Sequence, residues 1–210
     1  MINKKGLLLV VSGPSGTGKG TICKDIVAKH EDINLSISAT TRKPRVGEVE
    51  GKSYFFKTKE DFEDMVDKGE FLEHAMIYDN YYGTPKKAIF DELDMGRDVI
   101  LEIEMQGAMQ IKEVYPQAVF IFVLPPSLQE LKNRIIGRGT ETEEQIEKRF
   151  NSAYDEIKLL GDYDYFIFNN IVEKSSEEIL NILEVEKNKV SKDILDMFEK
   201  EIENVKTIIK

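Results

Sequence analysis

The sequence has few of the residues that mark disulfide-bonded or zinc-binding proteins. Its 210 residues include one cysteine, two histidines and no tryptophan. Because Cys23 is the single cysteine, no intrachain disulfide can form, which is typical of a reducing compartment. His30 and His74 have no cysteine, aspartate or histidine partners at metal-ligand spacing. We therefore expect Cys23 to be a small buried residue and the two histidines to be structural or surface residues.

Excess positive charge and long apolar runs are also absent. The formal net charge at pH 7 is −10, which argues against a broad electrostatic contact with nucleic acid or an anionic membrane. The apolar run at 7–11 follows two lysines, as in a signal peptide, but it is short and leads into a glycine-rich turn. No run approaches the ~20 residues that span a membrane. We expect a cytoplasmic protein that binds neither nucleic acid nor membrane.

A glycine-rich stretch lies close to the start of the chain. The run at 7–11 predicts a buried strand, and apolar spacing after residue 21 predicts a helix. Strand, glycine-rich turn and helix form the context of a phosphate-binding loop, where backbone N–H groups and the helix N-terminus bind phosphate oxygens. The residues expected to bind a nucleoside triphosphate are Gly13, Pro14, Ser15, Gly16, Thr17, Gly18, Lys19, Gly20 and Thr21.

One position of this loop departs from the pattern G-x-x-x-x-G-K-[ST]. Gly20 stands where a Ser or Thr hydroxyl would ligate Mg²⁺, and Thr21 comes one residue later. The side chain of Lys19 is expected to place a positive charge near the outer phosphates. The loop therefore predicts triphosphate binding but leaves the metal environment open.

The remaining pattern predicts an α/β protein. Apolar runs at 98–104 and 118–124 predict two more central strands, and helical patterns alternate with them, which favours a parallel, doubly wound sheet. Between them and the first helix, the segment 35–93 is richer in short strands and turns, which indicates a small inserted unit. In that segment we predict strands at 35–40, 53–56 and 71–77, helices at 59–68 and up to residue 93, and a turn at 80–85. Further along, helices are predicted at 128–136, 142–160 and from 175 onward, with a strand at 165–168.

Two acidic residues close the predicted strand at 98–104. Glu102 and Glu104 are two apart, so both would point to one face at the strand's carboxyl end, where open α/β sheets bind ligands. They could hold Mg²⁺, directly or through water, or accept a hydrogen bond from a substrate amine. The alternative is a solvated strand end.

Arginines form two groups. Arg42 and Arg45 flank a proline on a loop and could clamp a phosphate, or they belong to a basic surface loop. Three further arginines are expected on a helix, on a glycine-flanked loop and on a second helix: Arg134, Arg138 and Arg149. A mobile segment that carries them could close over a triphosphate and neutralise charge in the transition state. The alternative is that these three arginines lie on surface helices and are simply solvated.

These stretches together resemble guanylate kinases. The resemblance covers about residues 7–184, and its motifs are 12–19, 36–45 with 47–48, 51–54, 70–73, 82–84, 105–107 and 125–142. By this resemblance the fold is that of P-loop nucleoside monophosphate kinases, with a parallel central sheet, an inserted mixed α/β GMP-binding subdomain and an arginine-bearing lid. The core would comprise 1–34, 94–133 and 151–210, the GMP-binding subdomain 35–93 and the lid 134–150. An extra C-terminal helix would occupy 184–210, and its amphipathic face would pack on its own core, lie in solvent or form a homodimer.

The resemblance also implies roles for single residues. The residues expected to bind the acceptor GMP or dGMP are Ser38, Arg42, Arg45, Tyr54, Glu73, Tyr82, Thr84, Glu102 and Glu104. Within this set, Glu73 would accept from guanine N1–H and the amino group, while Ser38 and Thr84 would donate to O6 and N7. ATP would contact the phosphate loop, Arg134, Arg138 and Asn169, and the catalytic cations would be Lys19, Arg42, Arg134, Arg138 and Arg149. No protein residue is expected to bind Mg²⁺ directly, although Glu104 could reach it through water.

Two departures from the family and three rival functions remain. Gly20 replaces a serine and Glu104 replaces an aspartate, and both changes touch the expected metal environment. The rivals are an inactive guanylate-kinase-like module that binds proteins, a kinase for another nucleoside monophosphate, and a regulatory GTPase. A regulatory GTPase would carry the motifs D-x-x-G and N-K-x-D, which this sequence lacks.

Overall fold

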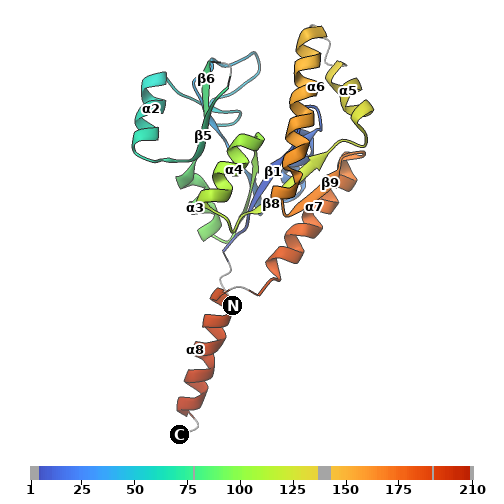
Figure 1. Ribbon diagram of the computed structural model, residues 1–210. Coiled ribbons are helices and arrows are strands. Elements are labelled where there is room, and N and C mark those ends of the chain that lie inside the picture. Colours follow the sequence, from blue (N-terminus) through green and yellow to red (C-terminus); the bar gives the residue numbers. More distant parts are fainter. Residues whose placement is uncertain (1–4, 78, 137–142, 191, 209–210) are drawn as a thin grey trace.

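The computed structural model describes residues 5–77, 79–136, 143–190 and 192–208 (Figure 1). Its larger sheet has five strands in the order β2-β7-β1-β8-β9, all paired in parallel. The strands are β1 (Leu8–Ser12), β2 (Ile33–Leu35), β7 (Asp98–Glu102), β8 (Val119–Leu124) and β9 (Tyr165–Phe168). The predicted α/β fold with a parallel central sheet is therefore confirmed.

Helices cover both faces of this sheet because β1 and β8 are apolar and buried on both sides. On one face, Leu9 and Val11 pack with residues of α1 (Lys19–Lys29) and α7 (Val172–Lys187). On the other face, Leu8 and Val10 pack with α3 (Lys86–Asp94) and α4 (Met105–Val114). Helices α5 (Leu128–Ile136) and α6 (Glu143–Ile157) lie together near the carboxyl ends of the strands, and the last residue of α6, Ile157, packs with Phe122 and Leu124 of β8 (Figure 1).

A second, four-stranded sheet lies within the segment 35–93. Its order is β4-β3-β6-β5, formed by β3 (Ala39–Thr40), β4 (Phe55–Phe56), β5 (Phe71–Ile77) and β6 (Asn80–Pro85). Helix α2 (Lys59–Asp67) covers it through Phe62, whose ring stacks on Phe71 at 4.5 Å between centroids. Residue Leu35, in contrast, belongs to β2 of the larger sheet.

Several predicted elements differ from the structure. The predicted turn at 80–85 is wrong, since these residues form β6 and pair antiparallel with β5. The predicted strand at 35–40 is two strands in different sheets, β2 and β3. The predicted helix at 142–160 has its start outside the described residues, and α6 gives way to a 3₁₀ helix, Lys158–Asp162.

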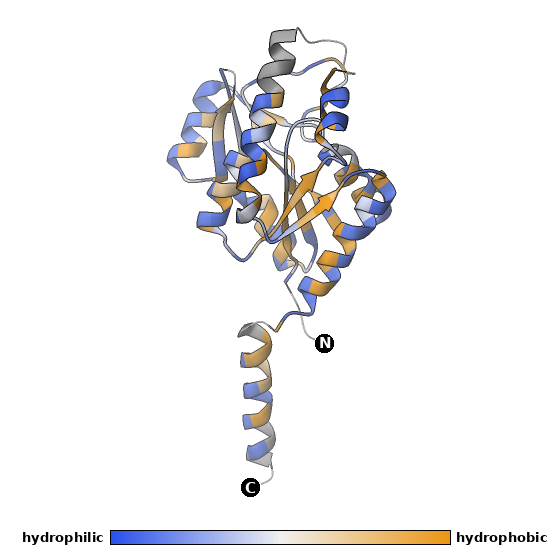
Figure 2. Ribbon diagram, turned by 45° about the vertical axis from the view of Figure 1, so that its right-hand side comes forward, coloured by the Kyte–Doolittle hydropathy of each residue, from blue (hydrophilic) through white to orange (hydrophobic). Residues whose placement is uncertain are grey.

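Two further corrections concern the ends of elements. Strand β7 ends at Glu102, and Glu104 is the N-cap residue of α4, so the two acids do not share a strand. The predicted C-terminal helix is two helices: α7 begins at Val172 and ends at Lys187, and α8 spans Lys192–Ile208. Helix α8 extends away from the rest of the protein (Figures 1 and 2). Within the described part of the chain, no helix is long and apolar enough to cross a membrane.

Candidate functional site

The phosphate loop connects β1 to α1. Gly18, the N-cap residue of α1, has φ 90°, a left-handed conformation that glycine adopts without strain. The side chain of Lys19 is buried and folds back over the loop, where its ammonium group donates to the carbonyl oxygens of Gly13 and Pro14. The lysine side chain thus lies inside the loop. A bound phosphate could take the place of the two carbonyl groups as the acceptor from its ammonium group.

Asn169 is hydrogen-bonded to the backbone of this loop. It follows β9 and is buried, and its Nδ2 donates to the carbonyl oxygen of Thr17 at 2.7 Å. A Cβ atom on Gly18 would lie 2.4 Å from this Nδ2, so any side chain at this position would have to displace Asn169. Arg134 of α5 donates from Nη1 to the carbonyl oxygen of Asn169 at 3.2 Å. Asn169 and Arg134, both expected at the ATP site, therefore lie at the phosphate loop.

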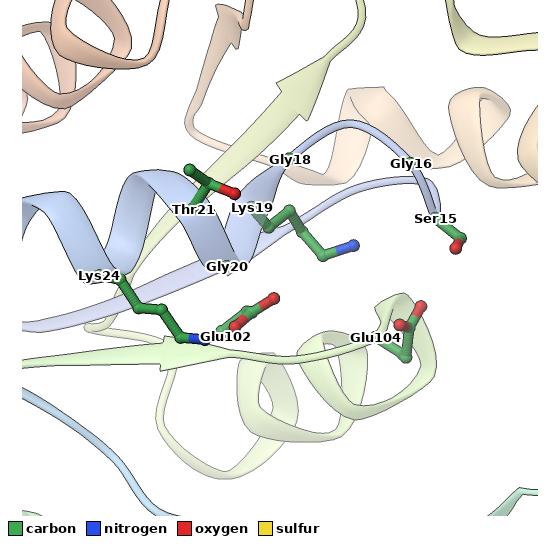
Figure 3. Close-up of a pocket in the computed structure, with 9 residues that line it drawn as sticks. All are labelled: Ser15, Gly16, Gly18, Lys19, Gly20, Thr21, Lys24, Glu102 and Glu104. Carbon is green, nitrogen blue, oxygen red and sulfur yellow. The ribbon is translucent and has the colours of Figure 1, made fainter. Parts of the chain in front are cut away.

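A cavity of about 440 Å³ opens in front of the loop (Figure 3). We call it the phosphate-loop cavity, and it is lined by Ser15, Gly16, Gly18, Lys19, Gly20, Thr21, Lys24, Glu102 and Glu104. Although Glu104 is not on β7, both carboxylates line this cavity, Glu102 beside Lys24 and Glu104 below Ser15. Loss of hydration raises the pKa of Glu102 above its usual value, opposed by the positive charges of Lys19 and Lys24.

The departure at Gly20 has a structural counterpart in Glu102. A Cβ atom on Gly20 would lie 2.9 Å from each carboxylate oxygen of Glu102. The space that a serine would need is therefore occupied by the end of a flexible acidic side chain. This relationship was not visible in the sequence, because the two residues are 82 positions apart and meet only when β7 pairs with β1.

The second sheet carries a buried carboxylate. Glu73 of β5 is 7% exposed, and its Oε1 accepts a 2.6 Å hydrogen bond from the hydroxyl of Thr84 on β6. Burial raises the pKa of Glu73, and the hydrogen bond from Thr84 partly offsets this. A Cβ atom on Gly107 of α4 would lie 2.8 Å from Oε2 of Glu73. Sequence reasoning assigned no role to Gly107, although it lies in one of the family motifs.

Arg42 forms another polar group at the edge of the same sheet. Its Nη1 and Nη2 donate to the two carboxylate oxygens of Glu48 at 3.0 and 2.8 Å. Its Nε donates to the hydroxyl of Tyr82 at 3.2 Å, and its Cζ lies 5.4 Å from the ring centroid of Tyr54. The structure therefore brings three of the expected phosphate ligands together and adds Glu48, to which sequence reasoning gave no role.

The other expected residues are less closely grouped. Arg45 is exposed, and its backbone N–H donates to Glu48 at 2.7 Å. Ser38 is half-buried between β2 and β3. Arg138 lies outside the described residues, and Arg149 lies in α6 with a side chain that is not described.

Helix α4 links the two sites. It begins after Glu104 at the phosphate-loop cavity, and three residues later Gly107 contacts Glu73. The side chain of Gln110 then exchanges two hydrogen bonds with the backbone of His74 on β5, at 3.2 and 3.1 Å. One short helix thus fixes the carboxylate of the second sheet relative to the phosphate loop.

Comparisons with known proteins agree on one family. The family model described as guanylate kinase matches residues 5–186, a range that includes both sheets and ends before α8. A guanylate kinase of Clostridioides difficile is 66% identical over 205 residues, covering 96% of this chain and 100% of that protein. One from Caldanaerobacter subterraneus is 54% identical over 191 residues, covering 91% and 93%. The crystal structure of guanylate kinase from Anaplasma phagocytophilum matches with a TM-score of 0.73 and 36% identity, covering 89% of each chain.

Proposed function

Because the chain belongs to the guanylate kinase family, we propose that its two polar sites bind the two nucleotides of one phosphoryl transfer. The reaction moves the γ-phosphoryl group of ATP to GMP, so the protein is a nucleoside monophosphate kinase. ATP would bind at the phosphate loop and GMP at the second sheet. The observation that carries this proposal is the buried carboxylate of Glu73, beside Thr84 and Gly107.

Glu73 suits guanine because its carboxylate can accept from two adjacent donors, N1–H and the 2-amino group. Adenine presents an acceptor at N1, which would leave two acceptors facing each other without a proton between them. In this structure the hydroxyl group of Thr84 donates its proton in a hydrogen bond to Glu73. We therefore propose that Thr84 orients Glu73, and that the expected donation to O6 or N7 needs a different rotamer or falls to Ser38.

The chemistry would need no general base from the protein. The second pKa of a phosphate monoester is about 6, so the attacking oxygen of GMP is mostly ionised at neutral pH. Catalysis then consists of holding the two phosphates in line and neutralising the charge that develops between them. Lys19 and Arg42 supply positive charge from opposite sites, and Arg134, Arg138 and Arg149 are proposed to supply the remainder from 134–150, the proposed lid.

For Mg²⁺, the residues present fit a site completed by the nucleotide. Glu102 and Glu104 offer carboxylate oxygens to the phosphate-loop cavity, and carboxylates are ligands that Mg²⁺ accepts. Within the described residues, no group of three or more histidines, cysteines or acids could hold a metal by itself. We propose that phosphate oxygens and water provide most ligands, with Glu104 contacting one water. Direct ligation by Glu104 in a structure with ATP and Mg²⁺ would contradict this.

We also propose a homodimer formed through α8. Leu195, Phe198 and Ile202 are about half exposed and follow the 3-4 spacing of a coiled coil, which continues at 205 and 209 in the sequence. A parallel pair would place Glu201 of one copy opposite Lys206 of the other, which favours a second copy of this chain as the partner. Helices in proteins draw most of their stability from packing of an apolar face, which a second copy would provide for α8. Cytoplasmic location and dGMP as a second acceptor stay predictions.

A coupled assay of ADP release tests the proposed activity. GMP, dGMP, AMP, UMP and CMP would each be supplied with ATP and Mg²⁺, and we expect rapid ADP release with GMP and dGMP only. Release with AMP as the favoured acceptor would indicate a kinase for another nucleoside monophosphate. No release with any acceptor would indicate an inactive binding module.

A further inference from the structure

The orientation of Arg42 is set by a carboxylate that the proposed mechanism does not use. Glu48 accepts from both terminal nitrogens of the guanidinium group, at 3.0 Å from Nη1 and 2.8 Å from Nη2. Nη1 also donates to the carbonyl oxygen of Lys43 at 2.9 Å. The Nη1–Nη2 edge of Arg42 is therefore occupied by protein groups in this structure.

The other edge of the same guanidinium group faces a tyrosine. Nε donates to the hydroxyl of Tyr82 at 3.2 Å, and the guanidinium group lies over the ring of Tyr54. The rings of Tyr54 and Tyr82 meet edge to face, with 6.1 Å between centroids. An anion bound by both Arg42 and Tyr82 must therefore approach the edge formed by Nε and Nη2. There it would accept from the second N–H of Nη2 and would replace the Tyr82 hydroxyl as the acceptor from Nε.

Glu48 is itself held in place. Its Oε2 also accepts from the backbone N–H of Arg45 at 2.7 Å, and its own N–H donates to the carbonyl oxygen of Arg45 at 3.1 Å. The hydrogen bonds from Arg42 and from the backbone of Arg45 lower the pKa of Glu48 to about 2. The carboxylate thus stays ionised at any pH at which the enzyme would work.

We infer that Glu48 is a positioning residue for the phosphate of the acceptor nucleotide: it holds Arg42 by one edge and leaves the edge beside Tyr82 for the phosphate. This inference rests on the proposed function, because it assumes that Arg42 binds the phosphate of GMP. The alternative is that the Glu48 carboxylate occupies the phosphate's own position and competes with it. The place of Tyr82 argues against competition, since its hydroxyl lies on the edge that Glu48 does not use.

Calorimetric titration with GMP and with guanosine separates these roles, because only GMP carries the phosphate. The change is Glu48→Gln, which keeps the shape but puts an NH₂ group against the arginine. Glu50→Gln is the matched control, since Glu50 lies in the same loop and accepts from the backbone N–H of Phe56 at 2.8 Å. For Glu48→Gln we expect about tenfold weaker GMP binding and unchanged guanosine binding. Glu50→Gln should change neither.

Three results would overturn the inference. Tighter GMP binding in Glu48→Gln would mean that the carboxylate competes with the phosphate. Equal losses for GMP and guanosine would mean that Glu48 only supports the fold of the second sheet, and no loss would mean that Arg42 needs no orientation. Failure of the wild-type protein to bind GMP would instead contradict the proposed function.

A double variant tests whether Glu48 acts through Arg42. In Arg42→Lys, the single ammonium group cannot donate in the two-point geometry of the Glu48 carboxylate, so adding Glu48→Gln to that background should cost no further GMP affinity. A further loss in the double variant, equal to that of the single change, would contradict a role that acts through Arg42. In steady-state kinetics, Glu48→Gln should raise KM for GMP and leave KM for ATP unchanged.

Discussion

The hydroxyl of Thr84 donates a 2.6 Å hydrogen bond to Oε1 of Glu73, and both side chains are buried. The other carboxylate oxygen lies against the backbone of Gly107, where a Cβ atom would come within 2.8 Å. The Glu73 carboxylate is therefore fixed by contacts from two elements, β6 and α4. The proposed recognition of guanine N1–H and the 2-amino group would use an acceptor that is already held in place before the nucleotide binds.

The first prediction concerns the cost of keeping Glu73 charged. Because burial raises its pKa above the usual 4.5, the free energy of unfolding of the wild-type protein should fall as the pH rises through that raised value. Glu73→Gln removes this loss, so the variant should become more stable than wild type at pH 7 to 8, with the difference shrinking toward pH 4. Urea unfolding at several pH values measures this.

A control residue whose carboxyl pKa is lowered, not raised, strengthens that test. Glu92 pairs with Arg97, which lowers the pKa of its carboxyl group. Its contribution to stability is present above its usual pKa and is lost as the pH falls. Glu92→Gln should therefore be less stable than wild type at pH 7, with the difference shrinking in acid. A Glu73→Gln variant that behaves in this second way would contradict a raised pKa at Glu73.

The second prediction concerns Gly107→Ala. Alanine favours a helix over glycine by roughly 0.5–1 kcal/mol, so the fold should tolerate the change. The new methyl group would meet Oε2, Cδ and Cγ of Glu73 at 2.8, 3.1 and 3.3 Å and must displace the carboxylate. We expect KM for GMP to rise about tenfold with an unchanged KM for ATP, a shift of about 1.4 kcal/mol in binding. Gly161→Ala, where a Cβ meets nothing within 4 Å, should leave both KM values unchanged.

Much of the phosphate loop could be predicted from sequence, because its signals are local. The apolar run before Ser12, the glycines and Lys19 fix a strand, a turn and a helix within 20 residues. Strand β6 could not be predicted in this way, because Asn80, Gly83 and Pro85 are residues typical of turns. They form a strand because β5 and β3 lie on either side of them, which is a tertiary relationship.

The same limit applies to the sites. Arg42, Tyr82 and Glu73 could be named from motifs, yet the partners that orient them could not. The bond between Arg42 and Glu48 depends on how the loop folds, and the contact between Glu73 and Gly107 joins residues 34 positions apart. Glu104 was expected on a strand because its spacing from Glu102 fits one. The chain turns into α4 before it, and both acids still line one cavity.

The third prediction tests the contact behind the phosphate loop. Gly18→Ala would strain a residue at φ 90° and place a Cβ 2.4 Å from Nδ2 of Asn169. Gly69→Ala is the matched control, since φ is 66° there and a Cβ would meet nothing within 4 Å. Both should lose about 1–2 kcal/mol through backbone strain, but only Gly18→Ala should also weaken ATP binding. Equal ATP affinity in the two variants would contradict a role for Asn169 in supporting the loop.

The fourth prediction concerns α8. Ile202→Asp places a charge on the exposed apolar stripe and should convert a dimer into a monomer, as measured by light scattering during gel filtration. Lys200→Asp changes the opposite face of the helix and should leave the dimer intact. A wild-type monomer, or a dimer that survives Ile202→Asp, would contradict the proposed interface. In a parallel pair, Leu195→Cys should form an intersubunit disulfide, whereas an antiparallel pair would not bring these positions together.

The most direct test of guanine recognition compares GMP with IMP, which lacks the 2-amino group but keeps N1–H. The quantity is the ratio of kcat/KM for GMP to that for IMP, measured with ATP in the wild type and in Glu73→Gln. If Glu73 accepts from both donors, the wild-type ratio should reach about 100, since an unpaired buried group costs up to ~3 kcal/mol. The variant ratio should fall toward 1. Equal ratios in the two proteins would show that Glu73 does not read the base.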